Sequence, residues 1–209
     1  MNRRRAALAA PLLLVALLAG CASGSTDRPE VSANGERGWH GTTVTDGYPL
    51  PGQTFTDTAG DTVTPTELAD RPVTLVFFGY THCPDICNVV LANIASALRG
   101  ASPGVRKDVR LLFVTTDPAR DTPRVVREYL DRFDPAYEGL VAPVGTVAKA
   151  AKALYISYEK PDGSTGGSYE VDHGTYTTGF LAGTARVVWS ADTSVADLRA
   201  DLTRLAGLA

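Results

Sequence analysis

Residues 73–87 read VTLVFFGYTHCPDIC, and this stretch holds both the first core strand and two of the chain's three cysteines. Its first half, 73–79, is a near-continuous apolar run of strand length, as expected when helices cover both faces of a sheet. Its second half places Cys83 and Cys87 where a helix is predicted to begin, with Pro84 at the first helical position. Because a helix N-terminus carries partial positive charge, we expect a sulfur there to be pushed toward thiolate, the form that attacks disulfides and binds metals.

The pattern on either side alternates between strands and helices. A second apolar run at 109–114 follows a segment, 84–98, with apolar residues at helical spacing, which predicts two parallel strands joined by a helix. Further predicted elements are a hairpin at 55–63, a turn of helix at 66–68, helices that begin at Thr122 and lie near 147–154, strands at 155–159, 176–181 and 185–189, and a closing helix at 195–205. This order predicts an α/β fold on the thioredoxin-like plan: a central mixed sheet flanked by helices, with an N-terminal hairpin and a hairpin or loop insertion before His173.

The N-terminus has the pattern of a secretory signal peptide at 1–20: a basic start, an apolar stretch at 6–18, then small residues. The ending Leu-Ala-Gly-Cys21 resembles the lipobox of bacterial lipoproteins, which implies cleavage before Cys21 and lipidation of that residue. An uncleaved membrane anchor is the alternative, although the apolar stretch is shorter than the ~20 residues of a comfortable span. Either way we expect the domain outside the cytoplasm, and in the lipoprotein form it is anchored to the outer face of the cell membrane.

Residues 21–45 are rich in small polar side chains and are predicted to be the lipidated N-terminus and a flexible tether, leaving 46–209 as one domain. His40 falls in this tether, where a solvated linker histidine is favoured over a metal-gathering one. Without the three arginines of the signal peptide, 17 basic residues face 23 acidic ones, a net charge of −6. This balance gives no indication of a nucleic-acid partner.

The spacing of the two cysteines restricts their chemistry. Side chains at i and i+4 of a helix have Cβ atoms about 5–6 Å apart, whereas a relaxed disulfide needs about 3.8 Å. If Cys83 is fully helical, the pair is better suited to bind a metal than to form a stable disulfide. If Cys83 is instead the N-cap, a labile disulfide with Cys87 remains open.

A third ligand is predicted in the segment Val-Asp172-His173-Gly, which lies between a turn-rich loop and a predicted strand. Thiolates with an imidazole favour copper(I) and tolerate copper(II) or zinc. A hydrogen-bonded structural histidine is the alternative for His173. Two neighbours are candidates for supporting roles: His82 could raise the thiolate fraction of Cys83, and Asp172 could orient His173. A surface or capping role for His82 and turn formation for Asp172 are the alternatives.

Three segments together resemble the signatures of the Sco/SenC family: GYTHCPDIC at 79–87, TDPARDTP at 116–123 and VDH at 171–173. The likeness runs from about Tyr48 to Ala206. One departure is Asn88, which stands where the family commonly has proline. Another is GFLAGT at 179–184, in place of the acidic turn that usually follows this strand.

The resemblance implies one copper ion bound by Cys83, Cys87 and His173. It also implies a role in assembling the binuclear copper site of cytochrome c oxidase, as metal donor, as reductant of the acceptor's cysteines, or as both. The implied partners are the copper-bearing oxidase subunit, other copper chaperones or a thiol reductant, and the membrane through the N-terminal lipid.

Competing functions use the same residues. In a thiol–disulfide oxidoreductase, Cys83 would attack and Cys87 resolve, but the three-residue spacing and the lack of proline before Tyr176 argue against this as the sole role. A peroxiredoxin is less favoured, because Tyr80 stands where a threonine is expected. A copper sensor or scavenger shares the metal site and is not distinguished by the sequence.

Overall fold

The computed structural model describes residues 31–32, 38–159 and 172–209. The predicted signal peptide, the lipidation residue Cys21 and most of the predicted tether therefore lie outside the described residues. Within the described part, no helix is long and apolar enough to cross a membrane.

Three parallel strands form the centre of the fold. β5 (Val73–Gly79) pairs in parallel with β6 (Val109–Thr115), and β6 pairs in parallel with β7 (Glu138–Val141). All seven residues of β5 are buried. This arrangement confirms the predicted parallel strands and places the carboxyl ends of β5 and β6 side by side, where ligand sites gather in α/β sheets.

Antiparallel strands extend the sheet on both sides, so the sheet is mixed, as predicted. Its order is β1-β2-β11-β10-β5-β6-β7-β3-β4. The added strands are β1 (Val31–Ser32), β2 (Thr42–Val44), β3 (Phe55–Asp57), β4 (Thr62–Val63), β10 (Thr177–Leu181) and β11 (Thr184–Trp189). The β3–β4 pair is the predicted N-terminal hairpin. A separate two-stranded pair, β8 (Tyr158–Glu159) with β9 (Asp172–His173), precedes β10 as the predicted insertion.

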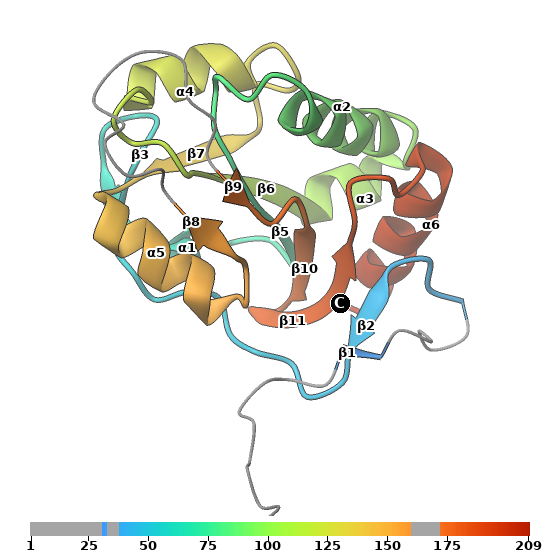
Figure 1. The fold of residues 1–209 in the computed structure, drawn as a ribbon. Coiled ribbons are helices and arrows are strands. Elements are labelled where there is room, and N and C mark those ends of the chain that lie inside the picture. The colour runs from blue at the N-terminus through green and yellow to red at the C-terminus, as the bar shows by residue number, and fades with distance from the viewer. Residues whose placement is uncertain (1–30, 33–37, 160–171) are drawn as a thin grey trace, which may run out of the picture.

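Helices cover both faces of the sheet (Figure 1). One apolar core lies under α2 (Ile86–Arg99), α3 (Pro103–Asp108), α4 (Pro123–Leu130) and α6 (Val195–Ala206). The second core lies under α1 (Pro65–Leu68) and α5 (Val144–Ala153). Burial on both faces explains why the central strands are apolar along their whole length.

Several element boundaries differ from the prediction. The helix expected from Pro84 begins at Ile86, with Asp85 as its N-cap, so the placement of Pro84 at the first helical position is wrong. Of the strand expected at 155–159 only the last two residues pair as a strand, β8, and Tyr155 takes a left-handed φ of 57° that is incompatible with a strand. Strand β7 and helix α3 were not predicted from the sequence, because both are short and carry no long apolar run.

The predicted tether also ends earlier than expected. Strand β2 lies beside β11 in the sheet, and Val44 is buried in the second core. Just before it, the backbone N–H groups of His40 and Gly41 donate to the Asp201 carboxylate of α6. The folded domain thus includes residues assigned from the sequence to the linker.

Candidate metal centre

The two cysteines lie where β5 leads into α2. Cys83 is two residues ahead of the N-cap and 6% exposed, while Cys87 is in the first turn and fully buried. Both are thiols rather than members of a disulfide. The Cys87 N–H donates to Cys83 Sγ at 3.4 Å, while the N-cap residue Asp85 makes no side-chain capping bond. The Cys83 sulfur therefore takes the position of a capping atom at the positive end of the helix.

The protonation of Cys87 differs from the expectation. A hydrogen bond to the Cys83 side chain, together with burial, raises the pKa of the Cys87 thiol above its ordinary value. The prediction that the helix terminus pushes the sulfurs toward thiolate is thus wrong for Cys87 in the metal-free protein. A metal that binds here must displace a proton from this sulfur.

The wall behind Cys87 is tightly packed. A Cβ atom at Gly79 would lie 3.2 Å from Cys87 Sγ and 2.9 Å from Cε2 of Phe113. A side chain at position 79 would therefore require the Phe113 ring to shift and would press on the Cys87 sulfur.

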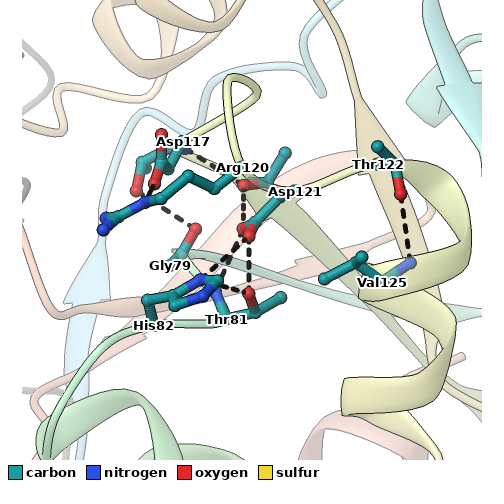
Figure 2. Close-up of polar contacts among 10 residues, drawn as sticks. Gly79, Thr81, His82, Asp117, Arg120, Asp121, Thr122 and Val125 are labelled. Atoms are coloured by element: carbon teal, nitrogen blue, oxygen red, sulfur yellow. Dashed lines mark hydrogen bonds and ion pairs between the residues drawn. The ribbon is translucent and has the colours of Figure 1, made fainter. Parts of the chain in front are cut away.

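The loop between β6 and α4 holds the cysteine loop through a buried carboxylate (Figure 2). Asp121 is fully buried and accepts hydrogen bonds from the Thr81 N–H (3.0 Å), the Thr81 hydroxyl (2.5 Å) and the Thr115 hydroxyl (2.6 Å). Asp121 was not singled out from the sequence as a functional residue. Its presence in the second signature segment was the one signal that pointed to a larger role.

The rest of this loop packs against the end of β5. The Thr116 N–H and hydroxyl both donate to the Gly79 carbonyl, at 2.7 and 3.1 Å. The buried Asp117 pairs with Arg120, whose guanidinium lies 5.9 Å from the centre of the Tyr80 ring. The first two signature segments are thus joined into one rigid edge next to the cysteines.

His82 faces the same loop. Its side chain is 54% exposed, with Nδ1 3.0 Å from the Thr81 hydroxyl and 3.8 Å from Asp121 Oδ1. These contacts fit a surface role in fastening the loop. The supporting role beside Cys83 stays a prediction.

Strand β9 brings His173 toward this edge of the sheet. His173 is the cross-strand partner of Tyr158, and the Tyr158 hydroxyl donates to the Thr116 carbonyl at 3.0 Å. The backbone at His173 is therefore linked through β8 to the same edge that carries the cysteine loop. The side chains of Asp172 and His173 lie outside the described residues, so their roles as ligand and orienting group stay predictions. Among the side chains that the structure describes, no three His, Cys, Asp or Glu residues form a group able to hold a metal.

A mixed sheet on this plan, with two thiols where the first central strand meets its helix, defines a thioredoxin-like dithiol protein. The SCO1/SenC family model matches residues 51–204. This chain belongs to the SCO1/SenC family.

Known proteins resemble the chain over different lengths. The Arabidopsis thaliana protein "SCO1 homolog 1, mitochondrial" is 36% identical over 103 residues, which make up 48% of this chain and 30% of that protein. The chain thus spans about a third of that relative's length. The apo Sco1 protein of Thermus thermophilus superposes with a TM-score of 0.71 at 31% identity, covering 80% of this chain and 96% of that one. Bradyrhizobium japonicum ScoI, solved with copper bound, superposes with a TM-score of 0.62 at 33% identity, covering 76% and 98%.

Proposed function

We propose that this chain binds one copper ion through Cys83, Cys87 and His173 and delivers it to the binuclear copper site of cytochrome c oxidase. The observation that carries the proposal is the hydrogen bond from Tyr158 to Thr116, which links the strand pair bearing His173 to the edge that holds both cysteines. The copper bound to the related Bradyrhizobium protein supports the choice of metal.

The donor set suits a soft ion that must later be released. Two thiolates and an imidazole favour copper(I) and accept copper(II). Both thiols lose their protons on binding, so copper uptake releases protons to solvent. Cys83, the slightly exposed member of the pair, is the ligand that an acceptor thiolate would replace first. Stepwise exchange of this chain's thiolates for those of the acceptor then moves the ion without releasing it into solvent.

Further parts of the proposal concern the location and partners of the protein. Cleavage after residue 20 and lipidation of Cys21 would anchor the domain to the outer face of the cell membrane. There it would meet the copper-bearing oxidase subunit, and it would receive copper or electrons from other copper chaperones or a thiol reductant. After such cleavage, 17 basic residues would face 23 acidic ones, and this net charge of −6 would favour partners with a neutral or basic docking patch.

Copper titration tests the ligand set, because the chain has three histidines that can be compared. The reduced protein is titrated with copper(I) in competition with a chelator of known affinity. We expect one equivalent to bind, and His173→Ala to weaken binding at least about tenfold through the loss of one ligand. His40→Ala is the matched control and should retain the affinity. Full affinity in His173→Ala would rule out the proposed triad.

A thiol–disulfide oxidoreductase is the second candidate, and the hydrogen bond between the Cys87 and Cys83 side chains favours it. Reduction of a model protein disulfide tests this function, with Cys83 attacking and Cys87 resolving the mixed disulfide. Brisk reduction that Cys83→Ala abolishes, together with copper binding unaffected by His173→Ala, would favour the oxidoreductase over delivery.

A further inference from the structure

A side chain of α4 reaches the cysteine loop through one intermediate residue. The Tyr129 hydroxyl donates to Asn88 Oδ1 at 3.0 Å, and Asn88 Nδ2 donates to the backbone carbonyl of Cys83 at 3.4 Å. Because a carbonyl oxygen only accepts, the Asn88 amide nitrogen must face Cys83, which leaves its oxygen for the tyrosine. The three groups form one directed chain of hydrogen bonds from α4 to Cys83.

Tyr129 is a rigid end for this chain. Its ring is 2% exposed and packs edge-on to Phe133, with centroids 5.3 Å apart and an interplanar angle of 71°. The Phe113 ring lies 5.8 Å away, and the Arg132 guanidinium lies 5.7 Å from the Tyr129 centroid. Packing on several sides determines where the hydroxyl lies, so the position of Asn88 is determined as well.

Several hydrogen bonds hold Cys83 when both cysteines are thiols. Its N–H donates to the Tyr80 carbonyl at 3.2 Å, its carbonyl accepts from Asn88, and its sulfur accepts from the Cys87 N–H. Closing a disulfide requires an S–S distance of about 2.0 Å and a matching approach of the two Cβ atoms. Cys83 lies outside the helix and is the residue that would have to move. Such a movement would strain the hydrogen bond from Asn88 Nδ2 to the Cys83 carbonyl.

We propose that Asn88 and Tyr129 are positioning residues that hold Cys83 in the open dithiol arrangement and disfavour its disulfide with Cys87. The open dithiol is the form that can receive a soft metal ion. The inference concerns the metal-free protein and holds whether or not copper delivery is its function.

The reduction potential of the cysteine pair tests the proposal. In glutathione buffers the two thiols give two electrons and two protons to oxidised glutathione, so that the Cys83–Cys87 disulfide and two reduced glutathione molecules form. Quenching with an alkylating reagent and mass spectrometry gives the oxidised fraction. We expect Asn88→Ala and Tyr129→Phe each to raise the equilibrium constant for oxidation about threefold to tenfold, the range expected for one lost hydrogen bond. A tenfold rise corresponds to a potential about 30 mV more negative.

Tyr137→Phe is the matched control. Tyr137 is also 2% exposed, and its hydroxyl donates to the Leu91 carbonyl at 3.4 Å. Leu91 lies in α2, one turn beyond Asn88 and so farther from Cys83. This variant removes a comparable buried hydroxyl, so it should lower the free energy of unfolding without changing the oxidation equilibrium. The double variant Asn88→Ala/Tyr129→Phe should shift the equilibrium no more than Asn88→Ala alone, because both residues act through one link.

Two results would overturn the proposal: an oxidation equilibrium unchanged in both Asn88→Ala and Tyr129→Phe, or an equal shift in Tyr137→Phe. Should Tyr129→Phe fail to fold, Asn88→Ala still decides, since Asn88 is only half-buried in the first turn of α2. The measurement contains no copper, so its outcome is independent of the copper titration.

Discussion

At the scale of single residues, the cysteines could be located from the sequence but their surroundings could not. Cys83 and Cys87 stand out because a strand pattern, a proline and a helical pattern adjoin them in the chain. Asp121 could not be singled out, because its partner Thr81 lies 40 positions away in the chain and meets it only in the folded protein. Its role depends on burial and on donors from both sides, which no local pattern reveals.

Gly79 gives a prediction at this scale. In Gly79→Ala the new methyl group would lie 2.9 Å from the Phe113 ring and 3.2 Å from Cys87 Sγ, both inside the packed core. Because neither neighbour can move without disturbing that core, we expect a loss of about 1–3 kcal/mol in the free energy of unfolding. Urea unfolding measures the loss, and copper affinity should fall as the sulfur is displaced.

Gly52→Ala is the control for this prediction, since a Cβ at position 52 meets nothing within 4 Å. It should change the stability by less than about 0.5 kcal/mol. Equal losses of stability in Gly79→Ala and Gly52→Ala would mean that the close packing at Cys87 and Phe113 does not restrict side-chain size at position 79.

At the scale of elements, the segment leading into β2 is held by the last helix. The Asp201 carboxylate of α6 accepts from the Gly41 N–H at 2.8 Å and from Trp189 Nε1 at 2.8 Å, and it is fully buried. Three positions farther along α6, about one helical turn, the Arg204 guanidinium lies 4.7 Å from the centre of the Trp39 ring. The composition of this segment resembles a linker, and only partners more than a hundred residues away make it part of the fold.

Asp201→Asn tests this attachment. The asparagine side chain has no negative charge and would turn an N–H donor toward groups that are themselves donors. We therefore expect the free energy of unfolding to fall by about 1.5–3 kcal/mol, the range for hydrogen bonds to charged groups. Because β2 is the element held by this carboxylate, the amides of Thr43 and Val44 should lose hydrogen-exchange protection before those of β5. Denaturant unfolding and exchange measured by NMR give both values.

Asp197→Asn is the matched control on the same helix. Asp197 pairs with the His40 imidazole at 3.1 Å, but both side chains are more than 40% exposed. Asp197→Asn should therefore lower the free energy of unfolding by less than about 1 kcal/mol, as for other surface ion pairs. A loss as large as that of Asp201→Asn would show that burial of the carboxylate is not what matters.

At the scale of the whole molecule, buried phenols on both faces of the sheet couple folding to alkaline pH. Burial raises the pKa of Tyr129 and Tyr137, which lie in the core under α2 and α4, and also that of Tyr48, which packs against the other core. The folded-state pKa of each lies above its unfolded value of about 10. Their contribution to stability is therefore complete below about pH 10 and is lost as the pH rises beyond it.

We expect Tyr48, Tyr129 and Tyr137 to resist ionisation until the protein unfolds. A spectrophotometric titration of phenolate absorbance should show a late group whose midpoint coincides with loss of the circular dichroism signal. Ionisation of all tyrosines in one early phase, with the fold intact, would contradict the assignment.

The alternation of strands and helices, the parallel central strands and the choice of Cys83 and Cys87 as the functional pair could all be predicted from the sequence. The reason is that apolar spacing and helix-start residues are patterns within a few neighbouring positions of the chain. Tertiary structure alone decided that α2 begins after Cys83, that residues before 46 join the sheet, and that α4 reaches the cysteine loop. The bond from Tyr129 to Asn88 spans 41 positions, and that from Gly41 to Asp201 spans 160. Such contacts depend on which surfaces the packed core brings together, and no local pattern encodes that choice.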